Sequence, residues 1–412
     1  MPRRFCAALL FVLAITISLP QPTCAQREMF KTWVEYDFGN QITFYTQIKS
    51  TSPIETAIVF FQAHNDTHTS IGLATVEKTG DDFYKLSYTH KIEDYHLRAF
   101  SRVDYRWEVN SAKEGKQRFP EESFEYIDNR YSWNSLEEKP FKVHWYEETG
   151  DVQFAQWVID AAQAGYKQAD DLLPLTLPNN SLEIYVYPDS ESMKTVLQPS
   201  SENWVAGHAD ADLGVIVVIL PPGPDQKLLI DQRIPHELMH ILLYQYTDPG
   251  YANLPTWLNE GLASQVELYP NSDYPILLEE AVKREALIPM VNLCQTFPRE
   301  ASNALLSYAE AASFTKYLHR TYGTTGLVDL VKAYANGLDC ERGAEQALGK
   351  NLTQLERAWR NDVLAEDTAQ AAINNLLPWL ILLAAVLAAP MAIAVRRLRF
   401  LPGRRPAKQR SG

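Results

Sequence analysis

The stretch that decides the organisation of this 412-residue chain is PHELMH, residues 235–240, together with WLNEGLA, residues 257–263. His236 and His240 are four residues apart, so a helix brings both imidazoles to one face, one turn from each other. Two imidazoles at that spacing can bind one small cation, and Glu237 lies beside them. The pattern H-E-x-x-H on a helix is typical of two zinc ligands and a glutamate that acts as a general base.

A catalytic zinc site uses three protein ligands and keeps its fourth position open. Glu260 is the best candidate for the third ligand, because it lies in a second stretch with helical spacing, residues 257–268. Gly261 follows it and, having no side chain, allows another backbone to approach closely. The sequence therefore predicts two packed helices that present His236, His240 and Glu260 to one Zn²⁺ ion.

Together, the two motifs resemble those of the gluzincin zinc metallopeptidases, in particular the peptidase MA-like family, which is related to aminopeptidase N. The resemblance covers roughly residues 140–365. It implies a thermolysin-like α+β domain in which His236, His240 and Glu260 bind Zn²⁺ and Glu237 is the general base. The G-x-M-E-N sequence that binds a free substrate amine in aminopeptidase N is not found, so the resemblance does not extend to aminopeptidase specificity.

A further segment, SYAEA at residues 307–311, is similar to the one that carries a tyrosine close to the reacting carbonyl in the aminopeptidase N relatives. The resemblance implies that the Tyr308 hydroxyl donates a hydrogen bond to the developing oxyanion, an interaction typically worth a few kcal/mol. The alternative interpretation is that Tyr308 is a packed helix residue. The catalytic residues that the sequence predicts are therefore Glu237 and Tyr308.

The N-terminal part, residues 26–135, predicts an all-β domain. Apolar residues alternate with polar ones in short runs between residues 30 and 128, and turn-forming clusters separate the runs every ten or so residues. About seven strands so spaced indicate an antiparallel sandwich of the immunoglobulin or fibronectin type III kind. The histidines of this region lack ligand-like spacing, so surface or turn positions are favoured over a second metal site; they are His64, His68, His90 and His96.

Residues 136–366 predict the α+β domain with a helical C-terminal part. Strands are expected at 142–146, 182–187 and 213–220, and helices at 151–172, 225–246, 257–268, 274–286, 304–322, 325–335, 341–348 and 352–365. Because a proline inside a helix removes a hydrogen bond, either the helix at 225–246 is kinked before His236 or the metal-binding helix starts near Arg233, with Pro235 in its first turn. The second alternative keeps both histidines on regular helix and is preferred. By the resemblance, the strand at 213–220 is the sheet edge that lines the cleft and can pair with an extended peptide. Because it is apolar on both faces, a place in the core of the sheet is the alternative, and the two roles are compatible.

The two ends of the chain predict targeting to a membrane. Residues 1–25 combine Arg3 and Arg4, an apolar run and small residues, which is typical of a secretory signal peptide. Residues 376–395 contain no charged side chain and would span about 30 Å as a helix. The basic tail, 396–412, then predicts a single-pass membrane protein whose N-terminal domains are extracytoplasmic and whose tail is cytoplasmic.

Charge and cysteine content limit the partners and the compartment. The net charge is −13, and nine basic residues lie in the predicted leader and tail, so residues 26–375 carry −22. Such an acidic region is not expected to bind nucleic acid. Of the four cysteines, Cys6 and Cys24 lie in the predicted leader. Cys294 and Cys340 remain, and a disulfide between them is favoured over zinc ligation.

The function that the sequence predicts is zinc-dependent hydrolysis of peptide bonds in a peptide or protein substrate, by a membrane-anchored extracytoplasmic enzyme. The alternative is a membrane-tethered binding or scaffold protein whose zinc domain is catalytically inactive. Turnover of peptides distinguishes the two, whereas zinc content does not, because an inactive site can still bind the metal. The oligomeric state and the substrate sequence are not predicted.

Overall fold

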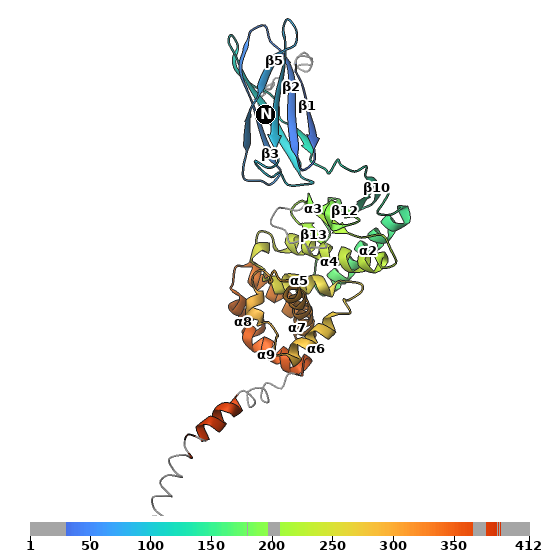
Figure 1. The fold of residues 1–412 in the computed structure, drawn as a ribbon, viewed down its shortest axis with the longest axis vertical. Helices are drawn as coiled ribbons and strands as arrows, with labels where there is room; N and C mark the ends of the chain where they lie inside the picture. The colour runs from blue at the N-terminus through green and yellow to red at the C-terminus, as the bar shows by residue number, and fades with distance from the viewer. Residues whose placement is uncertain are drawn as a thin grey trace, which may run out of the picture. The chain divides into compact units, whose positions relative to one another are not determined.

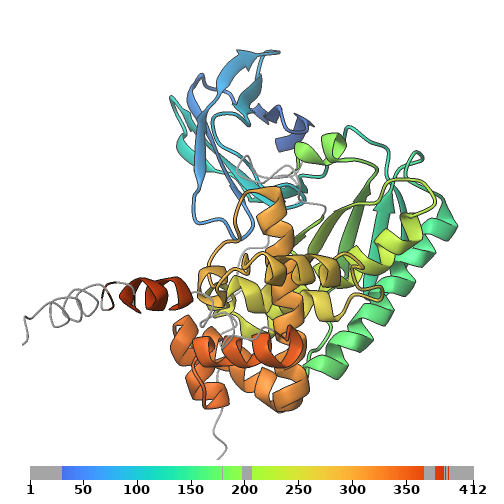
Figure 2. The ribbon, with the colours of Figure 1, turned by 60° about the horizontal axis from the view of Figure 1, so that its bottom comes forward.

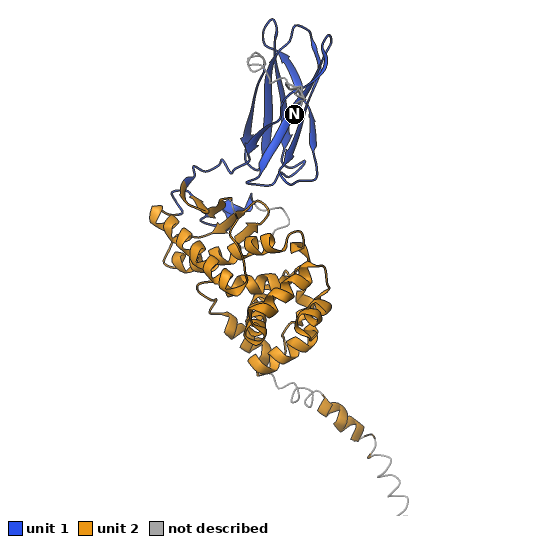
Figure 3. Cartoon of the chain, turned by 180° about the vertical axis from the view of Figure 1, so that it is seen from behind, with its two compact units in different colours: residues 1–134, 145–149, 187–205 blue, residues 135–144, 150–186, 206–412 orange. Residues whose placement is uncertain are grey.

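The computed structural model describes residues 30–178, 180–196, 207–365, 376–384, 386 and 388. The chain divides into two compact units, which Figure 3 shows in different colours. Unit 1 consists of residues 1–134, 145–149 and 187–205, and unit 2 of residues 135–144, 150–186 and 206–412. The predicted signal peptide, 1–25, and the predicted tail, 396–412, lie outside the described residues.

Unit 1 is built around two antiparallel sheets that pack face to face (Figure 1). One sheet has the strand order β1-β2-β6-β5, and the other has the order β4-β3-β7-β8 with β9 also paired to β7. Alternate residues of β2 are buried, which is the pattern of a strand with one face in a core. Phe44 of β2 contacts Phe61 of β3 and Tyr105 of β7, with ring centroids 4.7 Å and 5.3 Å apart. These contacts place one aromatic core between the sheets.

The all-β prediction for the N-terminal region is confirmed, but the predicted number of about seven strands is too low. The structure divides residues 30–125 into nine strands, because the turns at residues 74 and 112–114 separate short segments. The strands are β1 (Phe30–Asp37), β2 (Gln41–Lys49), β3 (Ile54–Ala63), β4 (Ser70–Leu73), β5 (Thr75–Lys78), β6 (Phe83–Lys91), β7 (Arg102–Ser111), β8 (Gly115–Arg118) and β9 (Glu122–Glu125).

Unit 2 begins with a five-stranded sheet in the order β10-β11-β12-β14-β13. Its strands are β10 (Asn134–Glu138), β11 (Phe141–Trp145), β12 (Leu182–Tyr187), β13 (Gly207–Asp210) and β14 (Val215–Ile219). The prediction that residues 213–220 form the sheet edge is wrong: β14 is buried along its whole length and lies between β12 and β13. The edge strand is β13, whose short polar sequence carries no strand signal of its own.

Helices make up the rest of unit 2. They are α2 (Val152–Leu172), α3 (Ser190–Lys194, of unit 1), α4 (Gln226–Thr247), η1 (Tyr251–Asn253), α5 (Thr256–Gln265), α6 (Tyr274–Lys283), η2 (Met290–Leu293), α7 (Ala301–Ala335), α8 (Cys340–Leu348) and α9 (Leu352–Val363). The two helices predicted at 304–322 and 325–335 are the two parts of α7, which Gly323 interrupts with a non-helical φ of 67°. Cys294 and Cys340 form the predicted disulfide, with their Cα atoms 6.3 Å apart.

The metal-binding helix does not start where the sequence predicts. α4 begins at Gln226 and runs through Pro235, so the expectation of a start near Arg233 is wrong. Two observations account for a proline inside this helix. Pro235 has no N–H to donate to the backbone carbonyl of Asp231. That carbonyl instead accepts a hydrogen bond from the Leu268 amide at 2.9 Å. The ring of Pro235 also packs against Gly165 of α2, where an added Cβ would lie 2.6 Å from Pro235 Cβ.

The described part of the predicted membrane segment is helical over residues 376–384. Its apolar side chains are exposed, with exposed fractions between 49% for Leu377 and 69% for Trp379. Within the described residues, no helix has both the length and the apolar content needed to cross a bilayer. Most of residues 385–395 lies outside the described part of the chain, so the membrane span stays a prediction.

Candidate metal centre

α4 places the two histidines of the first motif on one face. The imidazole rings of His236 and His240 are 5.1 Å apart between centroids, and the carbonyl and amide groups of the helix fix this spacing. The opposite side of α4 packs on β13, β14 and α2, which buries residues such as Ile234, Leu238 and Leu242. The histidine face is directed toward α5, because Glu260 of that helix lies next to both rings. The ribbons of α4 and α5, which contact each other, lie side by side in Figure 2.

α5 supplies the carboxylate that completes the group. Glu260 Oε2 lies 3.2 Å from His236 Nε2 and 3.7 Å from His240 Nε2. α5 is itself held against α7 at Gly261, where an added Cβ would be only 2.6 Å from the Ala311 carbonyl oxygen, as expected for a glycine that allows close helix packing. One ligand atom from each of the three side chains lies within 4.8 Å of the others. Two imidazole nitrogens and one carboxylate are a donor set that fits Zn²⁺.

The second nitrogen of each imidazole has its own acceptor. His236 Nδ1 donates to Glu267 Oε1 at 3.0 Å, and His240 Nδ1 donates to Asn259 Oδ1 at 3.1 Å. Asn259 Nδ2 in turn donates to the Tyr251 hydroxyl at 2.9 Å. Such contacts fix the ring orientation and leave each Nε2 free to bind a cation. Our sequence analysis did not identify either acceptor, although Asn259 precedes Glu260 directly in the second motif.

The charges of the group are strongly coupled. Burial lowers the pKa of His236, but the carboxylates of Glu260 and Glu267 together hold it well above its ordinary value. Burial likewise raises the pKa of Glu260, but the two histidines bring it below its ordinary value. The carboxylate of Glu260 is therefore ionised at neutral pH, as a ligand for a divalent cation must be.

Glu237 lies on the inner side of the same helix turn and is 8% exposed. Burial raises the pKa of its carboxyl group, and the neighbouring histidines oppose that shift. The carboxyl group contacts the backbone of Gly207 at the start of the edge strand β13, where an added Cβ would overlap with Glu237 Oε1. The predicted base is thus placed between the metal-binding helix and the open edge of the sheet.

Tyr308 of α7 reaches the same centre. Its ring centroid is 6.5 Å from that of His236 and 5.1 Å from that of Phe297. Burial, and then the negative charges of Glu260 and Glu237, raise the pKa of Tyr308. Its hydroxyl group therefore keeps its proton at neutral pH and can act as a hydrogen-bond donor.

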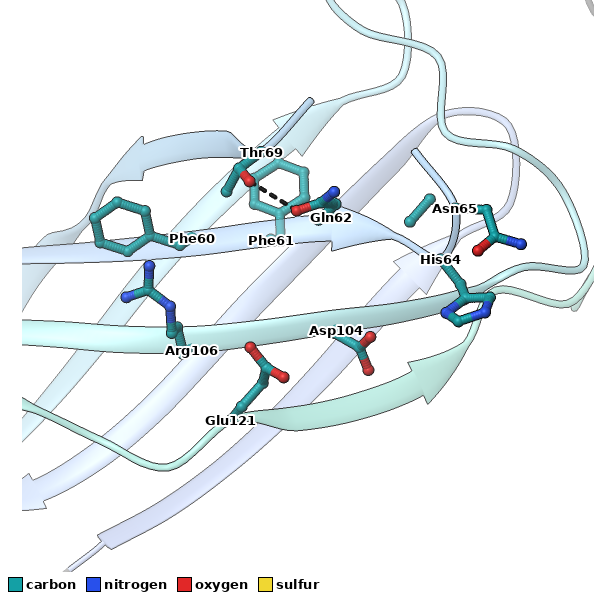
Figure 4. Close-up of a pocket in the computed structure, with 10 residues that line it drawn as sticks. Phe60, Phe61, Gln62, His64, Asn65, Thr69, Asp104, Arg106 and Glu121 are labelled. Carbon is teal, nitrogen blue, oxygen red and sulfur yellow. Dashed lines mark hydrogen bonds between the residues drawn. The ribbon is translucent and has the colours of Figure 1, made fainter. Parts of the chain in front are cut away.

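The N-terminal histidines take no part in a comparable group. Within the described ranges, His236, His240 and Glu260 are the three side chains that the structure brings together as possible metal ligands. Unit 1 instead contains a cavity of about 390 Å³ (Figure 4). In it, the guanidinium of Arg106 lies over the ring of Phe60 and Thr69 donates to Gln62. This cavity contains none of the predicted site residues.

One comparison with known proteins covers the part of the chain that carries the metal centre. Residues 161–365 match the family model described as the Peptidase MA superfamily. This match supports a peptidase MA-like family. It also supports peptidase activity in general for the region that carries the metal centre, since members of this superfamily are typically zinc metallopeptidases. A comparison with curated proteins gives no match.

A search of solved structures finds a similarity to ACE19, the collagen binding subdomain of Enterococcus faecalis surface protein ACE. That structure is 14% identical, and the similarity covers 24% of this chain and 97% of the ACE19 chain with a TM-score of 0.13. A TM-score of this size supports no inference about fold or function.

Proposed function

We propose that this protein is a gluzincin-type zinc peptidase that hydrolyses peptide bonds, with His236, His240 and Glu260 as the zinc ligands. The observation that carries the proposal is the approach of two imidazole Nε2 atoms and one carboxylate oxygen, from two packed helices, to within 4.8 Å of one another. Zinc, when bound there, supplies a Lewis acid that polarises a carbonyl group and lowers the pKa of a water molecule.

The remaining chemistry belongs to side chains of this chain. Glu237 takes a proton from the attacking water as the new carbon–oxygen bond forms. The same carboxyl group then delivers that proton to the amine nitrogen as the carbon–nitrogen bond breaks, so one water is consumed and one carboxylic acid and one amine are released. Tyr308, which stays protonated, donates a hydrogen bond to the oxyanion of the intermediate.

The edge strand β13 gives the substrate a place to bind. An exposed strand edge can pair with an extended peptide through main-chain hydrogen bonds. Gly207 of β13 contacts Glu237, so a peptide paired along this strand passes next to the general base. Substrates are therefore peptides or protein segments that can adopt an extended conformation.

We infer that the enzyme works outside the cytoplasm and is anchored by residues 376–395. The signal-like sequence at residues 1–25, the basic tail and the exposed apolar side chains of residues 376–384 support this inference. The disulfide between Cys294 and Cys340 is consistent with an oxidising compartment. Protease treatment of intact cells should digest the folded domains and leave a tag at the C-terminus intact; a protected N-terminal domain would contradict the inference.

The decisive experiment is Glu237→Gln in the purified protein without its predicted membrane segment. Gln has the shape of Glu but cannot take a proton, so zinc content should stay equal to that of the wild type while peptide turnover falls about 100-fold or more. Equal turnover in the two proteins rules the mechanism out. A wild-type protein that binds zinc but cleaves no member of a peptide library supports the alternative, a tethered binding or scaffold protein.

A further inference from the structure

We propose that Pro235 is a positioning residue for the metal centre. Because it has no N–H, it leaves the Asp231 carbonyl free to hold the segment that presents Glu267 to His236. This inference rests on the proposed zinc site, and it assigns a role to a proline that would otherwise only destabilise the helix. A proline in a helix interior typically costs about 3 kcal/mol relative to alanine.

The argument starts from the hydrogen bond that α4 lacks. In a regular helix the amide of residue 235 would donate to the carbonyl of residue 231. Proline has no amide hydrogen, and its ring crowds the carbonyl four residues earlier. In this structure the Leu268 amide donates to the Asp231 carbonyl at 2.9 Å. A residue from outside the helix thus takes the position that the helix leaves open.

The same anchor determines where Glu267 lies. α5 ends at Gln265, so Glu267 is not held by the hydrogen bonds of that helix. Its side chain is nevertheless only 8% exposed, and Oε1 lies 3.0 Å from His236 Nδ1. Leu268 follows Glu267 in the chain, and His236 follows Pro235. The Leu268–Asp231 hydrogen bond and the Glu267–His236 contact therefore both join the segment after α5 to the same part of α4.

A purely structural role for Pro235 is the competing explanation, because its ring packs closely against Gly165 of α2. Of the Pro235 atoms, Cβ comes nearest to Gly165: a Cβ built on that glycine would lie 2.6 Å from it. Alanine at position 235 keeps this Cβ and also restores the amide hydrogen. That amide can donate to the Asp231 carbonyl within the helix and compete with Leu268. Pro235→Ala therefore separates the loss of the anchor from the loss of packing.

The test compares Pro235→Ala, Glu267→Ala and the double variant in the metal-free and zinc-loaded protein. Hydrogen exchange of the Leu268 amide in the metal-free protein should become faster in Pro235→Ala. Zinc affinity, measured by competition with a chelator, should fall about 10-fold, at the lower end of the range typical for partners of metal ligands. Pro235→Ala should add no further loss in the Glu267→Ala background, which has no acceptor for the His236 Nδ1–H, because both changes act through one contact.

Unchanged Leu268 exchange together with unchanged zinc affinity overturns the proposal, and so do additive losses in the double variant. Pro188→Ala is the matched control, since it removes a proline from a segment outside α4 and should leave both measurements unchanged. Failure of the proposed function is recognised separately. In that case the wild type binds no zinc at all, while the exchange of the Leu268 amide still reports on the anchor.

Discussion

The histidines of α4 differ from those in the sandwich of unit 1: among the described residues, only the first group has a carboxylate placed to complete a possible cation site. On α4, each ring has one nitrogen directed to Glu260 and the other to a separate acceptor. In the sandwich, two of the rings make local contacts instead. His90, for example, is buried, and its Nε2 lies 2.9 Å from the Tyr95 carbonyl oxygen. His68 is exposed and lies next to Thr67.

The feature that distinguishes the α4 histidines is the carboxylate of Glu260, which both rings share, and not the number of histidines. A helix repeats every 3.6 residues, so a spacing of four directs two rings to one point. Strands and turns direct neighbouring histidines to different faces, so their rings do not meet at one point. Replacing one histidine in each group tests this explanation.

The largest effect is expected for His236→Ala compared with His90→Ala. The first change removes a proposed zinc ligand, so zinc affinity should fall by more than the roughly 100-fold that is the upper limit for an outer partner. The second change removes a buried ring and leaves the part-buried Tyr95 carbonyl without its partner, so it should cost about 1–3 kcal/mol of stability with no change in zinc affinity. Chelator competition and thermal unfolding of both variants check these outcomes, and equal zinc loss in both contradicts the comparison.

Much of this centre could be predicted from the sequence because its parts lie on regular helices. His236 and His240 share a turn of α4, and Glu260 lies on a helix whose glycine, Gly261, allows close packing. Glu267 could not be predicted in the same way. It lies beyond the end of α5, and its place depends on a hydrogen bond between a backbone amide and a carbonyl far away in the sequence.

Pro235 and the sheet edge were mispredicted for a related reason. Local rules correctly assign a cost to a proline in a helix, but they do not include the Leu268 amide that satisfies the freed carbonyl. The strand β14 carries a strong β-branched signal and was correctly predicted as a strand, but its assignment as the edge that lines the cleft came from the family resemblance. The actual edge, β13, has the sequence GHAD and is a strand through its pairing with β14. Tertiary contacts therefore decide both features.

A second large effect is expected for Glu310, a buried carboxyl group that, unlike Glu260, has no histidine beside it. Burial raises its pKa to about 8, against an ordinary value of 4.5. Because the folded state binds the proton more tightly than the unfolded state, stability should fall as pH rises from about 4.5 to about 8. Glu310→Gln should remove this fall and make the variant more stable at pH 7 by about 3 kcal/mol.

Urea unfolding of wild type and Glu310→Gln at several pH values measures this contribution. The two proteins should have similar stability near pH 4, where the carboxyl group is neutral in both states. Glu279→Gln is the matched control, because that side chain is 68% exposed and should change stability by no more than about 0.5 kcal/mol. A Glu310→Gln variant that keeps the full pH dependence of the wild type would show that the carboxyl group is ionised in the folded protein.

A smaller effect on the metal centre is expected for Asn259→Ala. His240 then loses the acceptor of its Nδ1–H, so its ring orientation is less well fixed and zinc affinity should fall about 10–100-fold. Asn253→Ala is the matched control: Asn253 donates to the Ala335 carbonyl and has no contact with the histidines, so its loss should not change zinc binding. Equal affinities of both variants would show that Asn259 does not orient His240.

The smallest effect is expected for His96, a histidine of the sandwich that lies outside the candidate metal centre. Burial alone lowers the pKa of His96, and within the described residues its buried Nε2 has no hydrogen-bond partner. The unfolded state therefore binds the proton more tightly, and stability should fall as pH drops below about 6.5. His96→Leu should remove that part of the pH dependence and leave zinc binding unchanged. The pKa of His236 is shifted in the opposite direction, because the carboxylates of Glu260 and Glu267 raise it. The same pH titration of stability, run on the metal-free protein, therefore distinguishes the two kinds of histidine.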